Sequence, residues 1–213
     1  MKTVLCYGDS LTWGYDAAGL GRRHAFEDRW PSVLQAELGG AARVIPEGLN
    51  GRTTAFDDYL ADCDRNGART LPTILASHAP LDLIILLLGT NDMKSFICGR
   101  AIGARQGMGR LIDIVRRLAY PMAATAPKVL LVSPPAVRET TDINFSAMYG
   151  ESIAESRKLA QFYAALATEA NCGFFDAGTV AEATPLDGVH LDAENTRRIG
   201  FALAPKVRDM LEL

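Results

Sequence analysis

The most constraining feature of this 213-residue chain is the run from Leu83 to Leu88, which reads Leu-Ile-Ile-Leu-Leu-Leu without one polar residue. A strand with one wet face alternates apolar and polar residues, whereas a strand covered by helices on both faces stays apolar throughout. The run therefore predicts the interior strand of a parallel sheet. Four other short segments have strand character, which are Thr3–Tyr7, Arg43–Pro46, Val129–Ser133 and Gly173–Asp176. Together with Leu83–Leu88 they predict five strands.

Amphipathic segments separate these strands. Apolar residues recur at three- and four-residue spacing around Trp30–Leu38, around Leu111–Leu118 and across Ser152–Asn171. A last helical segment starts near Asn195, and Pro205 predicts a kink or a second helix start within it. Alternating strands and helices form right-handed βαβ units, so the fold class is α/β, a three-layer α/β/α sandwich around a parallel five-stranded sheet.

One domain over residues 1–213 is expected, because the chain has no repeat, low-complexity stretch or linker. Residues 15–29 and 92–106 are long for connections. Segments of this length are lids, oligomer contacts or locally folded excursions. Their mixture of charged and aromatic residues suits a subunit interface, and a solvated loop fits the composition equally well.

Composition excludes several classes of protein. Hydrophobic residues make up 48% and charged residues 22%, which is typical of a globular domain. A net charge of -3 gives no electrostatic reason to bind nucleic acid, and no apolar run approaches the roughly 20 residues that cross a membrane. The apolar stretch after Lys2 is too short for a secretory leader, and the four cysteines form no Cys-x-x-Cys pair, so we expect a cytoplasmic protein without a zinc site.

The polar and glycine residues gather after the strands, where α/β sheets place their sites. Ser10 follows the first strand in Tyr-Gly-Asp-Ser-Leu-Thr. A serine that enters a helix there can attack a carbonyl, while its own backbone N–H helps to hold the oxyanion. A plain helix N-cap is the alternative.

A nucleophilic serine needs a base, and the chain has three histidines. His190 lies three residues after Asp187, in a loop that Gly188 turns, so one short loop can present both side chains. Asp187 would then fix the tautomer of the imidazole and stabilise its protonated form. His24 and His78 have no acid close in sequence, and we expect them to serve loop and surface packing.

Two further segments offer donors for an oxyanion. Asn91, in Gly-Thr-Asn-Asp, can donate from its carboxamide, and Gly51, in Leu-Asn-Gly-Arg, can donate an unobstructed backbone N–H. An Asx turn and a simple glycine turn are the respective alternatives. Asp9 and Asp92 fit supporting contacts, caps or metal ligands. Because no His/Asp/Glu cluster with ligand spacing accompanies them, we expect neither a metal nor a cofactor.

Together these segments resemble the SGNH (GDSL) hydrolases. The resemblance rests on four blocks in the expected order, which are Gly8-Asp9-Ser10-Leu11, Gly51, Gly89-Thr90-Asn91-Asp92 and Asp187-x-x-His190. It implies a flavodoxin-like fold and a serine esterase. By it Ser10 is the nucleophile, His190 the general base and Asp187 the orienting acid, while the Ser10 and Gly51 N–H groups and the Asn91 side chain form the oxyanion hole.

The sequence resembles one branch of this family in more detail, the bacterial arylesterase/acyltransferase branch. The segments that carry this resemblance are Gly-Asp-Ser-Leu-Thr-Trp-Gly, Asp28-Arg29-Trp30, Arg52-Thr53-Thr54 and Val132-Ser133-Pro134-Pro135. The branch implies small acyl esters as substrates, acyl transfer to alcohols besides hydrolysis, and a homo-octamer whose long loops close the active-site channel. Asn50 stands where the mycobacterial member has a serine. Because this position adjoins the oxyanion hole, the substrate range and the ratio of transfer to hydrolysis do not carry over.

Three more residues are candidates for the substrate pocket by position alone. Trp13 lies one turn past Ser10 and can equally be a core aromatic, Pro135 follows a strand, and Val189 adjoins the triad. A carbohydrate deacetylase, a lysophospholipase and a non-catalytic α/β binding module remain alternatives. A binding module has no reason to keep nucleophile, base, acid and oxyanion donors together.

Overall fold

A computed structural model describes residues 1–19, 22–121 and 124–213. Five strands form one sheet in the order β4-β1-β5-β6-β7, and every neighbouring pair is parallel. Their bounds are β1 Lys2–Gly8, β4 Ala42–Gly48, β5 Leu83–Leu87, β6 Lys128–Ser133 and β7 Gly173–Asp176. The predicted α/β sandwich with a five-stranded parallel sheet is confirmed.

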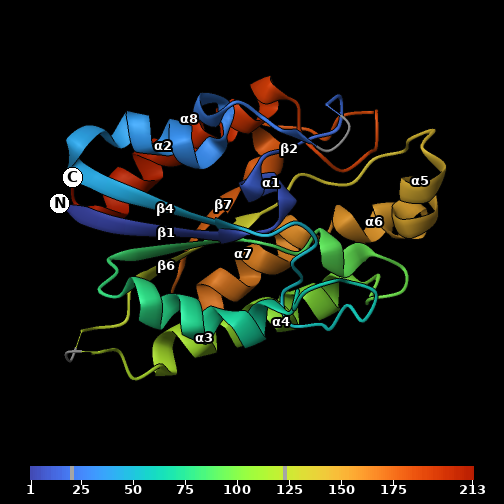
Figure 1. Ribbon diagram of the computed structural model, residues 1–213. Helices are drawn as coiled ribbons and strands as arrows, with labels where there is room; N and C mark the ends of the chain where they lie inside the picture. The colour runs from blue at the N-terminus through green and yellow to red at the C-terminus, as the bar shows by residue number, and fades with distance from the viewer. Residues whose placement is uncertain (20–21, 122–123) are drawn as a thin grey trace.

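The central strand β5 is fully buried on both faces. Ile84 and Leu86 face the core under helices α3 (Gly67–His78), α4 (Ala101–Arg117) and α7 (Leu159–Glu169). Leu83, Ile85 and Leu87 face the core under α2 (Trp30–Leu38) and α8 (Ala193–Leu211). Figure 1 shows these two helical layers on opposite sides of the sheet. Full burial of each such side chain stabilises the fold by roughly 1.5–3 kcal/mol.

Short elements cluster at the carboxyl ends of the strands, away from the two termini (Figure 1). They are α1 Ser10–Trp13, β2 Tyr15–Asp16, β3 Arg22–Arg23, η1 Phe26–Asp28, η3 Asn91–Met93, α5 Ile143–Tyr149, η5 Gly150–Ser152, α6 Ile153–Ser156 and η6 Ala177–Thr179. The short turn η2 (Gly39–Ala41) lies at the opposite edge, directly before β4 begins. Close packing here needs glycine at residue 48, because a Cβ on Gly48 would lie 2.6 Å from the Trp13 Cα.

Two helical predictions differ from the structure. Helix α8 is one helix through Pro205, so the expected second helix start does not occur there; Pro205 lies on the exposed face, while Leu203 and Val207 hold the other face in the core. The expected helix over Ser152–Asn171 is instead η5, α6 and α7. The break follows Ser156, whose hydroxyl donates to the Ile153 carbonyl at 2.7 Å and competes with the helical ladder.

The two long segments are largely structured. Residues 15–29 hold the antiparallel pair β2–β3 and η1, and residues 20 and 21 lie outside the described part of the chain. Residues 92–106 shorten to a connection over 94–100, because α4 begins at Ala101. The first turns of α4 bury small residues such as Ala104 and Gly107 instead of a large apolar stripe, so the sequence gives little sign of the helix there.

Candidate active site

Ser10, His190 and Asp187 form a continuous chain of hydrogen bonds. The Ser10 hydroxyl donates to His190 Nε2 at 2.9 Å, and His190 Nδ1 lies 2.6 Å from Asp187 Oδ2. A carboxylate only accepts, so the proton belongs on Nδ1 and Nε2 is free to accept from the serine. All three residues are buried. Strand β1 and the loop after η6 therefore meet at one point, although 180 residues separate them in sequence.

The Asp187 carboxylate is held from two sides. Its Oδ1 accepts the backbone N–H groups of Val189 and His190, both at 2.9 Å, because Gly188 turns the loop with a φ of 76°. Burial acts to raise the pKa of Asp187, but the contacts with His190 and these N–H groups outweigh it and hold the pKa below its ordinary value. The carboxylate thus stays charged beside the imidazole.

Three donors converge next to the serine. Within the described chain, the backbone N–H groups of Ser10 and Gly51 have no hydrogen-bond acceptor. Gly51 has a φ of 82°, a left-handed conformation that favours glycine. Asn91, in η3 after β5, presents its carboxamide at the same place. The carboxyl ends of β1, β4 and β5 therefore bring a hydroxyl, two N–H groups and an amide together.

The Asn91 carboxamide is anchored at both ends. Its Nδ2 donates to Asp9 Oδ2 at 3.3 Å and to the Arg52 carbonyl at 3.2 Å, while its Oδ1 accepts the Tyr149 hydroxyl at 3.2 Å. The hydroxyl fixes which way the amide points, because only the carboxamide oxygen can accept its proton. Burial raises the pKa of Tyr149, which keeps its proton on the oxygen.

Two buried carboxyls lie beneath this amide. Burial raises the pKa of Asp9 to about 7 and that of Asp92 to about 6. Asp9 caps α1 by accepting the Leu11 N–H at 2.9 Å. Asp92 accepts the Thr54 N–H at 3.0 Å and its hydroxyl, so it attaches the loop after Gly51 to the end of β5.

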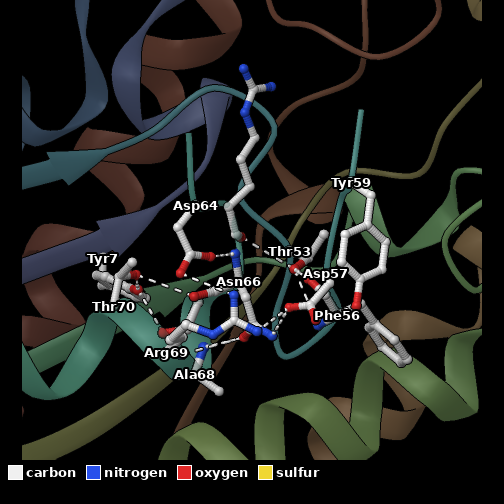
Figure 2. Close-up of polar contacts among 12 residues, drawn as sticks. Tyr7, Thr53, Phe56, Asp57, Tyr59, Asp64, Asn66, Ala68, Arg69 and Thr70 are labelled. Carbon is white, nitrogen blue, oxygen red and sulfur yellow. Dashed lines mark hydrogen bonds and ion pairs between the residues drawn. The ribbon is translucent and has the colours of Figure 1, made fainter. Parts of the chain in front are cut away.

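Residues 53–66 form a closed loop whose ends pair with each other. Thr53 donates its N–H to the Arg65 carbonyl at 2.9 Å, and the Asn66 side chain caps α3. Figure 2 shows Arg69 on α3 beside two carboxylates of this loop, Asp57 at 2.6 Å and Asp64 at 3.1 Å. This network fixes the base of the loop on α3 and so sets the position of both ends.

A cavity of about 130 Å³ opens beside Ser10 and His190. Its other lining residues are Tyr15, Asn50, Gly51, Arg65, Asn91, Lys94, Phe145, Met148 and Tyr149. The Tyr15 ring stacks on the His190 imidazole with a centroid distance of 3.9 Å, and the Phe145 ring meets the imidazole edge at 5.7 Å. Aromatic rings therefore contact the imidazole from two sides at the cavity wall.

The geometry agrees with the comparison of the chain with known families. The model of the GDSL-like lipase/acylhydrolase family matches residues 6–197. The chain belongs to this family. It is a carboxylic ester hydrolase on the SGNH scaffold, as its structural neighbours are.

Solved structures cover this GDSL-like hydrolase over its whole length. A carbohydrate acetylesterase family member from Sinorhizobium meliloti is 62% identical with a TM-score of 0.98, and each chain is covered completely. The native aryl esterase of M. smegmatis is 40% identical with a TM-score of 0.94, covering 99% of this chain and 100% of that one. A second carbohydrate acetylesterase from S. meliloti is also 40% identical, with a TM-score of 0.93 and the same coverage. A search of curated proteins returned no match.

The structure of this family member brings five predicted site residues together, which are Ser10, Gly51, Asn91, Asp187 and His190. Of the predicted pocket residues, Asn50 lines the cavity, with its Oδ1 buried and without a partner among the described residues.

Trp13, Pro135 and Val189 are not among the residues that line this cavity. The Trp13 ring instead lies under the Arg23 guanidinium at 4.7 Å, because Gly14 turns the chain at the end of α1. Val189 packs into the core beneath the triad loop, and the buried Pro135 lies by η6, with its Cα 3.8 Å from where a Cβ on Gly178 would lie.

Several lining residues of the hydrolase went unpredicted. Lys94 lies one helical turn after Asn91, and this spacing could have placed it at the site. Phe145, Met148 and Tyr149 share one face of α5 at i, i+3 and i+4, and this pattern could have predicted a common apolar wall. Arg65 carried none, because only the path of the loop over 53–66 brings it back to Gly51.

The other two histidines have defined partners. His24 is buried, and its Nε2 lies 3.0 Å from the Leu191 carbonyl, which ties the segment before η1 to the triad loop. His78 Nε2 lies 2.8 Å from Glu47 Oε1. An acid that is distant in sequence is therefore adjacent in space, and His78 does more than the expected surface packing. Neither reaches the cavity.

A larger cavity of about 480 Å³ lies at the carboxyl ends of β6 and β7, lined by Ser133, Arg138, Asp176 and neighbouring residues. Its described lining includes no histidine, whereas Ser10 and His190 both line the smaller cavity. Over residues 1–19, 22–121 and 124–213, no group of three or more His, Cys, Asp or Glu side chains is arranged to hold a metal ion. No helix in the described part of the chain is long and apolar enough to cross a membrane.

Proposed function

We propose that the protein is a serine esterase that hydrolyses small acyl esters, including acetyl and aryl esters, through an acyl-enzyme. The observation that carries this proposal is the Ser10–His190–Asp187 hydrogen-bond chain at 2.9 and 2.6 Å, opening on a cavity of about 130 Å³. In this mechanism His190 takes the Ser10 proton as the hydroxyl oxygen attacks the ester carbonyl.

The tetrahedral oxyanion is then stabilised by the Ser10 and Gly51 N–H groups and the Asn91 amide. One Asn91 hydrogen leaves its long contact of 3.2–3.3 Å and turns to the oxyanion, which as a charged acceptor binds it more strongly. His190 returns the proton to the leaving alcohol. Water, or another alcohol in the transfer reaction, attacks the acyl-enzyme with His190 again as base.

Hydrolysis of p-nitrophenyl acetate by the wild type and by Ser10→Ala tests this proposal. We expect turnover by the wild type and none by the variant, with circular dichroism showing that both are folded. Equal rates for both proteins contradict a nucleophilic Ser10. A rate that is flat or rises from acetyl to octanoyl esters contradicts the small acyl pocket.

A carbohydrate acetylesterase is the second candidate, supported by the 62% identity to a member of that class over the complete chain. Comparing kcat/KM for an acetylated monosaccharide with that for phenyl acetate separates the two. Preference for the sugar ester assigns the carbohydrate acetylesterase activity, for which Asn50 Oδ1, without a partner among the described residues, is a candidate acceptor of a sugar hydroxyl. Preference for phenyl acetate assigns the arylesterase activity.

We also propose a homo-oligomer, an octamer by resemblance, in a reducing, cytoplasmic location. Exposed Tyr59, Leu60 and Ile143 near the site support subunit contacts, and four unpaired cysteines suit a reducing compartment. Light scattering measures the assembly. A mass near the 23.0 kDa of one chain contradicts it.

A further inference from the structure

Two cationic side chains line the cavity beside Ser10. Lys94 has a side chain only 11% exposed and lies 3.5 Å from the buried Asp58 carboxylate. Arg65 is 23% exposed, and its Nη2 donates to Asp62 at 3.0 Å. Hydrolysis of a neutral acetyl ester needs neither charge, so their presence beside the serine needs another explanation.

The absence of a side chain at Gly51 lets Arg65 into the cavity. A Cβ on Gly51 would lie 2.8 Å from the Arg65 Cδ and closer still to Nη1. The guanidinium therefore lies against the backbone whose N–H is a proposed oxyanion donor. A substrate group bonded close to the ester carbonyl is within its reach.

Arg65 retains capacity to bind. Its Nε is buried and has no acceptor within the described structure. Its partner Asp62 has a side chain 89% exposed, and such exposed ion pairs contribute little. A buried donor without a partner is costly, and a ligand atom that accepts from it removes that cost.

The two cations also repel each other. Burial lowers the pKa of Lys94, Asp58 raises it, and the positive charge of Arg65 lowers it again. An anion bound in the cavity would offset both the burial and the repulsion. A guanidinium fork matches a carboxylate in geometry as well as in charge.

We propose that Arg65, assisted by Lys94, binds a carboxylate carried by the ester substrate close to the scissile bond. The inference rests on the proposed esterase function and specifies its substrate class as anionic carboxylic esters. The carboxylate belongs either to the acyl group, as in half-esters of dicarboxylic acids, or to the alcohol, as in acetyl esters of hydroxy acids.

Matched ester pairs test the inference. The acyl-side pair is 4-nitrophenyl hemisuccinate and its methyl ester, and the alcohol-side pair is 2-acetoxybenzoate and its methyl ester. We expect wild-type kcat/KM to favour the anion in one pair, and Arg65→Leu to lower that anion-to-neutral ratio by about 10-fold or more. Arg65→Lys should keep part of the preference. The pair that responds identifies the side that carries the carboxylate.

Arg117→Gln is the matched control. Helix α4 begins at Ala101 near the cavity and ends at Arg117, about 24 Å further along the helix. The Arg117 side chain is 78% exposed there, so the substitution removes one positive charge far from the cavity. The ratio should equal that of the wild type. A ratio that is the same in wild type and Arg65→Leu for both pairs overturns the inference, as does a drop of equal size in Arg117→Gln.

Wild-type protein alone provides a second test, should Arg65→Leu fail to fold. Raising sodium chloride should lower the anion-to-neutral ratio, because salt screens the contact. A ratio at or below one at every salt concentration overturns the inference while hydrolysis still depends on Ser10. Hydrolysis that does not depend on Ser10 contradicts the proposed function itself, so the two failures are distinguishable.

Discussion

The Tyr15 ring lies parallel to the His190 imidazole, with centroids 3.9 Å apart and an angle of 24° between the planes. An aromatic face attracts a cation, and the imidazole becomes one when it takes the serine proton. Tyr15→Leu should therefore lower kcat by about 2- to 30-fold, whereas Tyr15→Phe keeps the ring and should retain most activity. Steady-state kinetics on one aryl acetate measures this. Equal kcat in the Leu and Phe variants would argue against the stack.

Replacing the acid of the triad should separate folding from catalysis. Asp187→Asn keeps the shape of the side chain but favours the wrong tautomer of His190, so we expect kcat to fall by about 10⁴-fold. Circular dichroism should be unchanged. Activity near that of the wild type would assign the orienting role to another group.

The Tyr149 hydroxyl should matter for turnover more than for substrate binding. Tyr149→Phe removes the 3.2 Å bond that orients Asn91, and we expect kcat to fall by about 2- to 12-fold with little change in KM. Tyr163→Phe is the matched control, because its buried hydroxyl donates to the Leu88 carbonyl instead. A loss of the same size in both variants would indicate a general packing effect.

Gly51 and Arg65 should be energetically coupled. Gly51→Ala should lower the free energy of unfolding by about 1–2 kcal/mol, because an alanine is strained in the left-handed conformation of this residue. The clash of the new Cβ with Arg65 should lower the free energy of unfolding further. In an Arg65→Ala background the clash disappears, so the penalty should shrink by about 0.5–3 kcal/mol. Urea unfolding of the four proteins in this cycle gives the coupling. Additive effects would mean that Arg65 moves aside freely.

The buried Asp9 should make stability fall as pH rises. Its pKa is about 7 in the folded state against an ordinary value of 3.8, so between these values the folded protein holds a proton that the unfolded chain releases. The contribution is complete below about pH 4 and is lost as pH rises through 7.

Asp9→Asn removes this term and can still cap α1. Its free energy of unfolding relative to the wild type should increase from pH 5 to pH 8, by about 1.4 kcal/mol for each pKa unit titrated in that interval. Parallel pH profiles for the two proteins would contradict the raised pKa.

The strands and the triad were accessible from sequence for definite physical reasons. A strand covered on both faces must be apolar, so the apolar run over Leu83–Leu87 predicts a buried strand. Parallel strands end at one edge, so polar residues that follow them are brought together whatever the loops do. This rule places Ser10 and Asn91 at the site edge, and a short loop places Asp187 beside His190. Their roles were assigned by the resemblance to the SGNH hydrolases, because position alone left a helix cap and an Asx turn open.

The rest of the cavity depends on tertiary structure that local patterns do not encode. Arg65 lines the cavity beside the serine because its loop is closed by contacts to α3, and Trp13 instead packs under Arg23, which the turn at Gly14 brings back over the ring. Pro205 failed to break α8 because packing of the opposite face outweighed a local preference. Specificity therefore rests on the features that sequence spacing describes least well.

The junction of β1 with the triad loop has a consequence for how the enzyme acquires activity. Ser10 and His190, the proposed nucleophile and base, are 180 residues apart in the sequence, and folds rich in contacts of such long separation form slowly. During refolding, helical signal should recover before hydrolysis. Turnover is thus a reporter of the last step of assembly, and partly folded molecules, however rich in secondary structure, contribute nothing to the measured rate.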